Sequence, residues 1–559
     1  MRFKIFFIIF LLLYQTSLYS KGTEKNEFNQ KYLSNYFSAL LSHDNQKNDQ
    51  ALKFFESSKF LIKKHDNFLK EYVFSLVLNG QVKKSIKQIK TKKNPYNSNF
   101  FEANLLLIID RIQKKKFAEA SKLLDQFKKY KVEENYQFII YKTLESYNNL
   151  FLNNNIKKLN KDYGKLSLIT LAFQNCYLDS NNDNSHFLNV INSDETNYSR
   201  YLFFYLGNII ENKDIDMAKE IASTIDPLNS GLLVSQSKKW IEDEKFSNFN
   251  KYFSCKNPND LLAEFFFLIS NLFSSQENYE YSNFYINISN YLNSKFYFNL
   301  TLIAENHYSN KNFELANKIL EKINDEDEIF FWYKTKKKFQ IFSYNNDNED
   351  SIKFIEKKIK VFKNPSIKIL YDIANIYKNF KKYQKAIEYY SLVLYELDNF
   401  SSTYADVLYR RGGSFERIGD YEKSDIDLLN SLKIRPDDPY ILNYLAYGWL
   451  ERNYKIKDAI QMLNKAYMQE KNDPYITDSV GWGYYIIGDY KNAEKYLRWA
   501  VELLPNDPIT NDHYGDVLWK LNRKLQAKYF WESALKNEKT EEKMKKEIQS
   551  KLLNGLKKT

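Results

Sequence analysis

Small and large apolar residues recur in a fixed order between Asn364 and Asn537, where the periodicity of the chain is clearest. A first small residue recurs at spacings of 38, 34, 35 and 34, at Ala374, Gly412, Ala446, Gly481 and Gly515. Three positions later stands a large apolar side chain: Tyr377, Phe415, Trp449, Tyr484 and Leu518. A small residue lets a second helix approach, and a large side chain one turn later packs into the gap. The pattern therefore predicts paired helices.

The second helix of each predicted pair carries its own signature. Twelve or thirteen residues after the first small residue comes another, at Ala386, Ser424, Ala459, Ala493 and Ala527. Four positions further on lies a large apolar residue: Tyr390, Leu428, Leu463, Leu497 or Trp531. Proline near 436–439 and 505–508 ends one helix, and the Asp or Asn beside it starts the next. These residues have structural roles, so we do not assign them to a functional site.

This order of residues closely resembles the tetratricopeptide repeat (TPR) consensus, whose period is 34 residues. The resemblance implies an all-α fold, a right-handed α-solenoid of TPR helix pairs. Upstream the signature degenerates, with second-helix pairs such as Ala51 with Phe55 and Ala316 with Leu320. We predict degenerate repeats over 21–363 and a well-formed array over 364–537. The register is lost at about 140–200, where the alternatives are a continuous solenoid and a break into two arrays.

The C-terminal residues 538–559 predict a capping helix and a tail. Thr540 is the expected N-cap, with Glu541 and Glu542 in the first turn. Met544, Ile548 and Leu552 form one apolar stripe, and Gly555 is expected to end the helix. A terminal helix with one polar face is what an open-ended stack requires.

The first twenty residues have the pattern of a Sec-type signal peptide. Arg2 and Lys4 precede an apolar run at 5–13, and a polar stretch ends at Ser20, the expected cleavage point. The run is too short to span a bilayer, which takes about 20 apolar residues. No cysteine follows it, so a lipoprotein signal is absent. We predict a periplasmic protein without a transmembrane span; an uncleaved N-terminal anchor is the alternative.

Composition agrees with helices joined by short loops, because the 559 residues include only 14 Gly and 9 Pro. The net charge of +12 does not indicate a nucleic-acid partner, since Lys is interleaved with Asp and Glu along the whole chain rather than gathered in a patch. The only cysteines, Cys176 and Cys255, lack metal-site spacing. One disulfide in an oxidising compartment and two separate buried thiols both remain open.

No motif for catalysis, metal binding or cofactor binding is found, so we expect a protein that is not an enzyme and needs no cofactor or metal. The five histidines are scattered. Asp512, His513 and Asp516 form the one local constellation of note. A carboxylate beside a lone histidine on a repeat helix more often makes a capping or inter-repeat hydrogen bond than a catalytic pair.

The first helices of stacked pairs line the concave face of such a solenoid, so their inward positions are the candidate protein-binding groove. Aromatics mixed with acids and amides suit an extended peptide or a partner helix. Counting from the repeat register gives twelve candidates: Tyr409, Arg417, Tyr440, Asn443, Tyr447, Tyr475, Asp478, Trp482, Tyr485, Asp512, Asp516 and Trp519.

The last repeats carry more than the general consensus. The stretches at 443–447, 478–485, 503–508 and 511–519 read NYLAY, DSVGWGYY, LLPNDP and NDHYGDVLW. They resemble the C-terminal region of exported proteobacterial TPR proteins, some of which are outer-membrane adaptors of a periplasmic carboxyl-terminal processing protease. The resemblance implies a periplasmic scaffold or adaptor, with that protease as one possible client. The alternative is a structural assembly factor for envelope or secretion machinery that uses its convex side.

Overall fold

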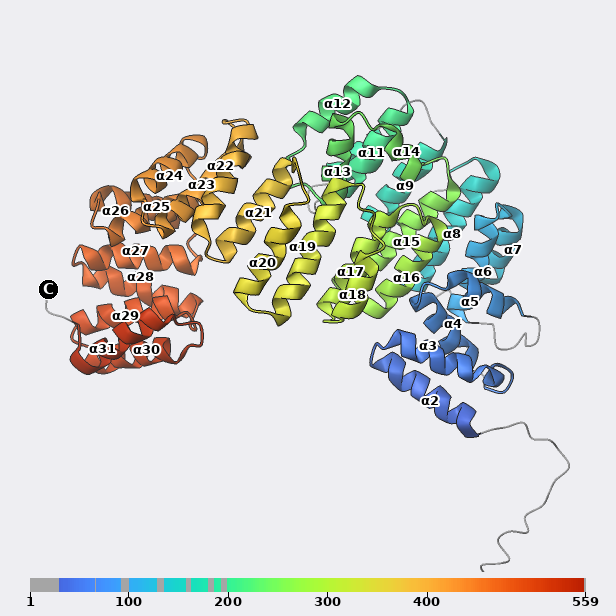
Figure 1. The fold of residues 1–559 in the computed structure, drawn as a ribbon, viewed down its shortest axis with the longest axis horizontal. Helices are drawn as coiled ribbons and strands as arrows, with labels where there is room; N and C mark the ends of the chain where they lie inside the picture. Colours follow the sequence, from blue (N-terminus) through green and yellow to red (C-terminus); the bar gives the residue numbers. More distant parts are fainter. Residues whose placement is uncertain are drawn as a thin grey trace, which may run out of the picture. The chain divides into compact units, whose positions relative to one another are not determined.

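The computed structural model describes residues 30–65, 67–91, 100–127, 135–156, 162–178, 185–192 and 199–556. All the regular secondary structure in these ranges is helical, and they contain no strand (Figure 1). The predicted fold class, an all-α solenoid of TPR helix pairs, is confirmed. The predicted signal peptide at 1–20 lies outside the described residues.

The chain divides into two compact units. The N-terminal unit comprises the described residues up to Ile225, together with Gly231–Ile341. Its helices are α2 (Gln30–Asp44), α3 (Asn48–Ser57), η2 (Lys59–Lys63), α4 (Phe68–Leu78), α5 (Val82–Lys90), α6 (Phe101–Gln113), α7 (Phe117–Phe127), α8 (Tyr136–Asn153), α9 (Lys165–Leu178), α10 (Ser185–Ile191), α11 (Ser199–Glu211), α12 (Ile215–Thr224), α13 (Leu232–Glu242), α14 (Ser247–Tyr252), α15 (Pro258–Ser275), α16 (Tyr279–Leu292), η4 (Tyr297–Asn299), α17 (Leu300–Ser309), α18 (Phe313–Leu320) and most of α19 (Glu328–Asn345).

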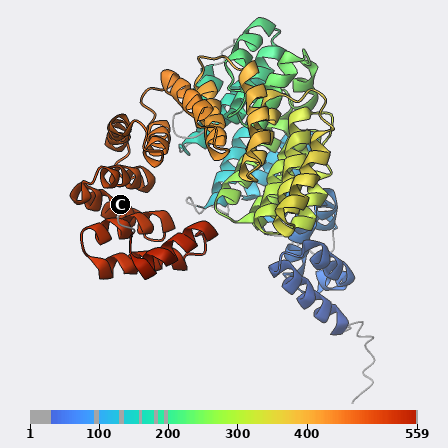
Figure 2. The ribbon, with the colours of Figure 1, turned by 60° about the vertical axis from the view of Figure 1, so that its left-hand side comes forward.

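The C-terminal unit comprises Asp226–Ser230 and the chain from Phe342 onward. Its helices are α20 (Asn348–Ile359), α21 (Ile367–Asn379), α22 (Tyr383–Glu396), α23 (Ser402–Arg417), α24 (Tyr421–Ile434), α25 (Pro439–Glu451), α26 (Ile456–Gln469), α27 (Pro474–Ile486), α28 (Tyr490–Leu503), α29 (Pro508–Lys520), α30 (Lys524–Lys536) and α31 (Glu542–Asn554). From α21 to α30 these helices form successive pairs, drawn in orange and red in Figures 1 and 2.

One kind of turn joins the two helices of every pair in this array. The turn contains a residue with positive φ, at Lys381, Gly419, Asn453, Gly488 and Asn522. The amide after it donates to the carbonyl five residues earlier, as from Asp489 to Tyr484 at 2.9 Å. This arrangement satisfies carbonyls that would otherwise be left open at the helix end. The turns recur at spacings of 38, 34, 35 and 34, the same as the small residues of the sequence pattern.

The same turn recurs in the N-terminal unit, where the sequence signature is weak. It is found at Gln46, Gly80, Lys115, Lys213, Glu244, Glu277 and Lys311, each with the same hydrogen bond spanning five residues. Among the described residues between Lys115 and Lys213 it does not recur. That gap contains the segment where the sequence register is lost. The helix-pair repeat therefore persists on both sides of it.

Three first helices of the array begin at the Asp–Pro steps of the sequence. Asp438, Asp473 and Asp507 are N-caps, each accepting two backbone N–H groups of a helix that begins with proline. The expected role of an Asp beside a proline is thus confirmed. At the C-terminus the expected N-cap was wrong. Glu541, not Thr540, occupies the N-cap position of α31, without a side-chain capping hydrogen bond, and the Thr540 hydroxyl donates instead to the Ala534 carbonyl at 2.6 Å. Gly555 ends α31 with a φ of 71°, as predicted.

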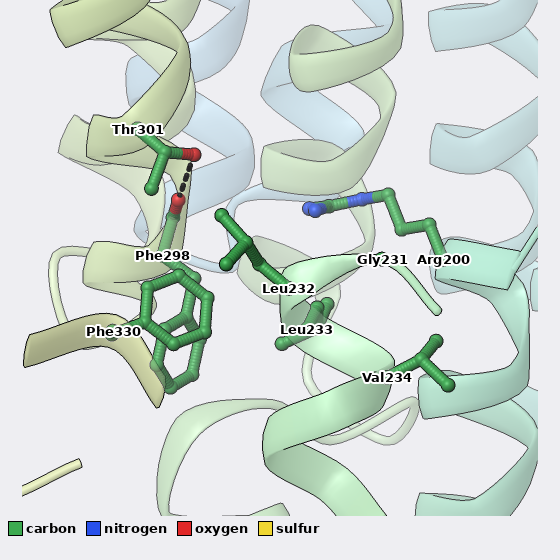
Figure 3. A pocket seen from close by; sticks show the side chains of 8 residues that line it. All are labelled: Arg200, Gly231, Leu232, Leu233, Val234, Phe298, Thr301 and Phe330. Carbon is green, nitrogen blue, oxygen red and sulfur yellow. Dashed lines mark hydrogen bonds between the residues drawn. The ribbon is translucent and has the colours of Figure 1, made fainter. Parts of the chain in front are cut away.

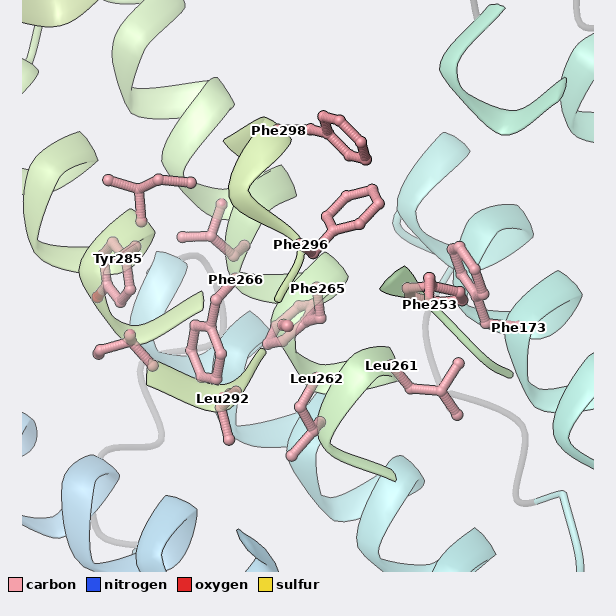
Figure 4. Close-up of a cluster of buried hydrophobic side chains, with 14 of the residues drawn as sticks. Phe173, Phe253, Leu261, Leu262, Phe265, Phe266, Tyr285, Leu292, Phe296 and Phe298 are labelled. Atoms are coloured by element: carbon pink, nitrogen blue, oxygen red, sulfur yellow. The ribbon is translucent and has the colours of Figure 1, made fainter. Parts of the chain in front are cut away.

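Aromatic side chains fill the core of the N-terminal unit (Figure 4). Phe253 packs edge-on against Phe204 at 4.5 Å between ring centroids, and Phe298 lies 4.4 Å from Phe330. Such pairs add about 0.5–1.5 kcal/mol each beyond the apolar area they bury. The large aromatic content of the chain is thus used largely for packing in this unit.

A disulfide between Cys176 and Cys255 links α9 to the turn before α15. The two residues are 79 positions apart in sequence, and their Cα atoms are 5.7 Å apart. Of the two possibilities left open by the sequence, the structure has the disulfide rather than separate thiols. Both cysteines are buried.

The helices of each pair come closest at the small residues. A Cβ added at Gly481 would lie 2.6 Å from Leu497 Cγ, and one at Gly515 would lie 2.5 Å from the Trp531 ring. These contacts are shorter than any real Cβ makes, so the second helix would have to move. Gly448, in contrast, lies within α25 and has nothing within 4 Å of an added Cβ.

We predict opposite effects of one substitution at two helical glycines. Gly515→Ala should destabilise the C-terminal unit by about 1–3 kcal/mol through overpacking against Trp531. Gly448→Ala should stabilise it by up to about 1 kcal/mol, because alanine is the better helix former and meets no neighbour. Urea unfolding followed by tryptophan fluorescence measures this, since five of the seven tryptophans lie after residue 342. Equal effects of the two variants would contradict the close-approach account.

Removing the disulfide should lower the stability of the N-terminal unit. The double variant Cys176→Ser plus Cys255→Ser should lower its free energy of unfolding by about 4 kcal/mol, because a cross-link across 79 residues restricts the unfolded chain. Urea unfolding of wild type with and without reductant provides the comparison. Two reactive thiols in the unreduced, denatured wild type would show that the bond is not formed.

Candidate functional site

All twelve predicted groove residues lie on the first helices of the C-terminal pairs, namely α23, α25, α27 and α29. The structure places them in different surroundings. Tyr409 and Arg417 line a cavity, and Tyr440 and Tyr475 are exposed at the starts of their helices. Asn443 and Tyr447 are half-buried on α25. The remaining six lie close to the end of the array, near α31.

A cavity of about 310 Å³ lies within the C-terminal unit. We call it the basic pocket and define it by its lining residues: Lys378, Asn379, Lys381, Tyr383, Tyr409, Gly413, Arg417, Tyr444 and Glu541. They come from the first three helix pairs of the array and, for Glu541, from the start of α31. Its size is at the lower end of the range for ligand pockets, about 300–1,000 Å³.

Positive charge dominates this pocket. Burial, together with the nearby Arg410 and Arg417, lowers the pKa of the Lys378 ammonium. Neither Lys378 nor Arg410 has an ion-pair partner in the part of the chain that the structure describes. Arg417 lies 3.4 Å from the carboxylate of Glu416, its neighbour in the chain. Lys378 and Arg410, which lack such a carboxylate among the described residues, favour an anion close to them.

Tyrosines and one carboxylate complete the pocket. Tyr409 packs edge-on against Tyr444, whose hydroxyl donates to Glu416 at 3.2 Å. Glu541 lies 3.4 Å from the Lys381 ammonium, and both side chains are largely exposed. The carboxylate from the end of the array therefore reaches the basic residues at its start.

Sequence reasoning found only part of this pocket. Tyr409 and Arg417 were among the predicted residues, but Lys378 and Asn379 were not, because the counting began one repeat too late. Applied to α21, the same register gives Lys378 and Asn379 at the positions that correspond to Glu416 and Arg417. No sequence signal indicates Glu541, since its proximity to Lys381 depends on how the successive pairs are stacked.

At the end of the array, predicted acidic residues are engaged within the chain. The Lys551 ammonium of α31 donates to both oxygens of Asp512, at 2.9 and 2.8 Å, and to Asp516 at 2.8 Å. Asp516 also accepts from the Trp531 indole N–H at 2.9 Å. His513 Nδ1 lies 2.9 Å from Asp478 of the preceding pair. The noted histidine therefore makes an inter-repeat hydrogen bond, the more common role weighed for it above.

Aromatic rings cover this buried cluster of charges. Trp482 stacks on His513 at 4.0 Å and on Tyr485 at 4.6 Å, and its indole N–H donates to Glu451 at 2.7 Å. Trp519 packs beside Trp531, and Gly555 lies directly against it. Most side chains in this part of the predicted groove thus connect one first helix to the next.

The cluster shifts the pKa values of its members. Burial raises the pKa of Asp516 to about 6, with Asp512 adding to the effect and Lys551 opposing it. Burial lowers the pKa of His513, but the carboxylates of Asp478, Asp512 and Asp516 outweigh this, and the net shift is upward. Both groups therefore bind a proton more strongly in the folded chain than in the unfolded one.

A second cavity, of about 150 Å³, lies in the N-terminal unit (Figure 3). Its walls are mainly apolar, with Leu232, Phe298 and Phe330 among them. The one charged wall residue, Arg200, donates to both oxygens of Glu264, each at 2.8 Å, and to Asn299 at 2.7 Å. These bonds use three of the five N–H groups of its guanidinium, and they hold Arg200 against α15.

Two further properties bear on the site. Within the described residues, no group of three or more His, Cys, Asp and Glu side chains is arranged to hold a metal ion. Over the same residues, no helix combines the length and the apolar character needed to cross a membrane.

Comparison with known proteins supports the presence of tetratricopeptide repeats in the C-terminal unit. Residues 367–395, which cover α21 and most of α22, match the family model of the tetratricopeptide repeat. A TPR repeat-containing protein of Pseudomonas aeruginosa is 32% identical over 111 residues, which is 20% of this chain and 19% of that protein. The chain thus matches about a fifth of the length of that relative.

Two solved structures that match this chain each cover about a third of it. MamA from Desulfovibrio magneticus RS-1 is 17% identical, with a TM-score of 0.27, and covers 32% of this chain and 97% of its own. A thermophilic TPR protein of Thermus thermophilus is 16% identical, with a TM-score of 0.30, and covers 34% of this chain and 100% of its own.

We predict that the C-terminal unit is more stable at pH 6 than at pH 8. The stabilising effect of protonated His513 is present below its unfolded pKa of about 6.5 and is lost as the pH rises through its higher folded value. Burial raises the pKa of Asp516 to about 6, so its protonation likewise stabilises the folded unit as the pH falls from 7 toward 4. The free energy of unfolding of this unit should therefore be higher at pH 6 than at pH 8.

Urea unfolding followed by tryptophan fluorescence at both pH values measures this difference. His513→Asn should reduce it, whereas Glu538→Gln, which alters one exposed charge in the same unit, should leave it unchanged. An equal dependence on pH in wild type and His513→Asn would show that this cluster does not set it.

Proposed function

We propose that this chain of tetratricopeptide repeats is a periplasmic scaffold that binds other proteins through the inward surface of its C-terminal unit. The basic pocket carries this proposal, because it is a ligand-sized cavity formed mainly by first helices of the array and lined by tyrosines and by three cations, of which Lys378 has no ion-pair partner among the described residues. Tyrosine and arginine are the residues that contribute most often to binding energy at protein interfaces.

The candidate residues divide between binding and structure. Tyr440 and Tyr475, with 53% and 57% of their surface exposed, are free to contact a partner together with Arg417. Asp478, Asp512 and Asp516 keep consecutive first helices and α31 in place. That the chain is not an enzyme stays a prediction; in this proposal the Asp512–His513–Asp516 constellation has a structural role.

The compartment is the second part of the proposal. A buried disulfide between Cys176 and Cys255 suits an oxidising environment, such as the bacterial periplasm, better than the cytosol. The signal-like pattern of residues 1–20 agrees with export. Residues 443–519 resemble a family of exported TPR proteins, some of which are protease adaptors, so a carboxyl-terminal processing protease is one candidate partner, to which the scaffold would present client proteins.

A second candidate, a structural assembly factor, is favoured by one observation. The second helices of the pairs also expose large apolar side chains, with Met468 at 66%, Tyr529 at 68% and Leu525 at 87%. An assembly factor held by such surfaces would contact its partners through second helices rather than through the inward surface.

Photo-crosslinking from single positions separates the two candidates. With p-benzoylphenylalanine at Tyr440 or Tyr475, we expect crosslinked partner proteins, identified by mass spectrometry in the native cell, because these side chains are exposed beside the basic-pocket helices. The same probe at Leu525 or Tyr529 should give few, since α30 is a second helix.

A pair of double variants serves as the matched control. Tyr440→Ala plus Tyr475→Ala should reduce partner recovery by about tenfold, as for the loss of anchoring aromatics, and Leu525→Ala plus Tyr529→Ala should not. All four side chains are exposed, so circular dichroism should show unchanged helix content. Partner recovery only from α30 would replace the groove proposal with the assembly-factor role.

A further inference from the structure

We propose that the second cavity, in the N-terminal unit, binds a neutral, benzene-sized molecule that carries an acceptor oxygen, such as a small aromatic ketone. Arg200 holds this oxygen, and the apolar walls hold the ring. The site goes beyond the proposed function, because it belongs to the other compact unit and takes a small molecule rather than a protein.

The volume and the walls of the cavity determine the size and the polarity of its ligand. Its volume is about 150 Å³, and an apolar cavity of about that volume accommodates one benzene-sized molecule. The rings of Phe298 and Phe330, 4.4 Å apart and each only 1% exposed, line its inner part. Leu232 and Leu233 add aliphatic surface. Such walls favour an aromatic ring, which packs well against other rings.

The cavity is open to solvent at one end. Gly231 is exposed, and the Arg200 side chain is 21% exposed. A molecule can therefore enter beside Arg200 without unfolding of the surrounding helices. Water in this space would find few hydrogen-bonding partners, because the Thr301 hydroxyl already donates to the Phe298 carbonyl at 2.8 Å (Figure 3). Replacing weakly held water by an apolar group favours binding.

Arg200 offers its polar contact in a fixed orientation. Its Nε and Nη2 groups donate to Glu264 and Asn299, and its guanidinium carbon lies 3.7 Å from the ring centroid of Phe267. Among the described residues, the two N–H groups of Nη1 have no acceptor. Figure 3 shows the guanidinium extending from α11 toward Leu232 and Thr301. This free edge is preorganised for an oxygen, since the rest of the group is already held.

The ion pair of Arg200 determines the charge of the ligand. Glu264 has only 1% of its side chain exposed, and its carboxylate already balances the charge of Arg200. A carboxylate ligand would bring a second negative charge into a mainly apolar space without a cation of its own, which is unfavourable. A carbonyl or hydroxyl oxygen accepts from the same N–H groups without this penalty. The ligand is therefore a neutral molecule.

Ligand-observed fluorine NMR on the full-length protein measures the affinity of three matched probes. They are para-fluoroacetophenone, para-fluoroethylbenzene, which lacks the carbonyl oxygen, and para-fluorobenzoate, which is charged. We expect the ketone to bind with a Kd of about 1 mM or lower, within the range for a ligand of this size. The benzoate should bind at least about tenfold more weakly than the ketone because of its uncompensated charge.

Two leucine substitutions assign the binding to the cavity. Leu232→Trp places an indole in the space and should weaken binding of the ketone by at least about tenfold, because the ring and the ligand cannot both fit. The matched control, Leu272→Trp, adds the same ring at an exposed position of α15 and should change the affinity by less than about twofold. Both variants keep the Arg200–Glu264 pair, and circular dichroism should show unchanged helix content.

Arg200→Lys tests the role of the free N–H groups. Lysine keeps a positive charge beside Glu264 but lacks the second edge of the guanidinium. The ratio of the Kd of para-fluoroethylbenzene to the Kd of the ketone should fall by about tenfold, the contribution of one hydrogen bond to a charged group. Comparing this ratio between the two proteins cancels the different hydration of the two probes.

Four results would overturn the inference. The first two are the absence of ketone binding to wild type at about millimolar concentration and equal effects of Leu232→Trp and Leu272→Trp. The third is tighter binding of the benzoate than of the ketone, which would indicate an anion site. The fourth is an unchanged ratio of the two Kd values in Arg200→Lys, which would show that Arg200 does not hold the oxygen.

Discussion

The close approach of two helices at a position without a bulky side chain is the contact on which the C-terminal unit depends. Gly481 and Gly515 allow Leu497 and Trp531 to lie directly over the facing helix. The turn with a positive-φ residue sets the direction of the second helix relative to the first. It recurs at the same spacing as these small residues. Because each pair buries its apolar surface only against itself and its neighbours, stability is distributed along the array. The surface of the first helices is thereby left free to vary.

Polar side chains on that surface have two uses. At the end of the array, Asp478, His513 and Lys551 connect consecutive first helices and α31 through buried, charge-assisted hydrogen bonds. At its start, Lys378 has no ion-pair partner among the described residues and lines an open cavity instead. The contrast separates structural from binding roles by a physical criterion, namely whether the chain itself neutralises a buried or half-buried charge.

Much of this could be predicted from the sequence, because repeat spacing follows from local packing. The small residues, the Asp–Pro helix starts and the stop at Gly555 are short-range features, and the structure has them where the pattern places them. The prediction that Thr540 is the N-cap of the last helix was wrong, because its hydroxyl donates to another acceptor, the Ala534 carbonyl. The Cys176–Cys255 bond and the approach of Glu541 to Lys381 depend on stacking over 79 and 160 residues, which no local pattern encodes. For the same reason, sequence reasoning listed Asp512 and Asp516 as groove residues without detecting Lys551.

Hydrogen–deuterium exchange on the full-length chain, with and without a crosslinking-identified partner, tests most directly whether the inward surface is the binding surface. Protection on binding should appear in α21, α23, α25 and α27, the first helices that carry the basic pocket, Tyr440 and Tyr475. Exchange in the second helices α24, α26 and α28 should be unchanged. Protection confined to the second helices would contradict the account.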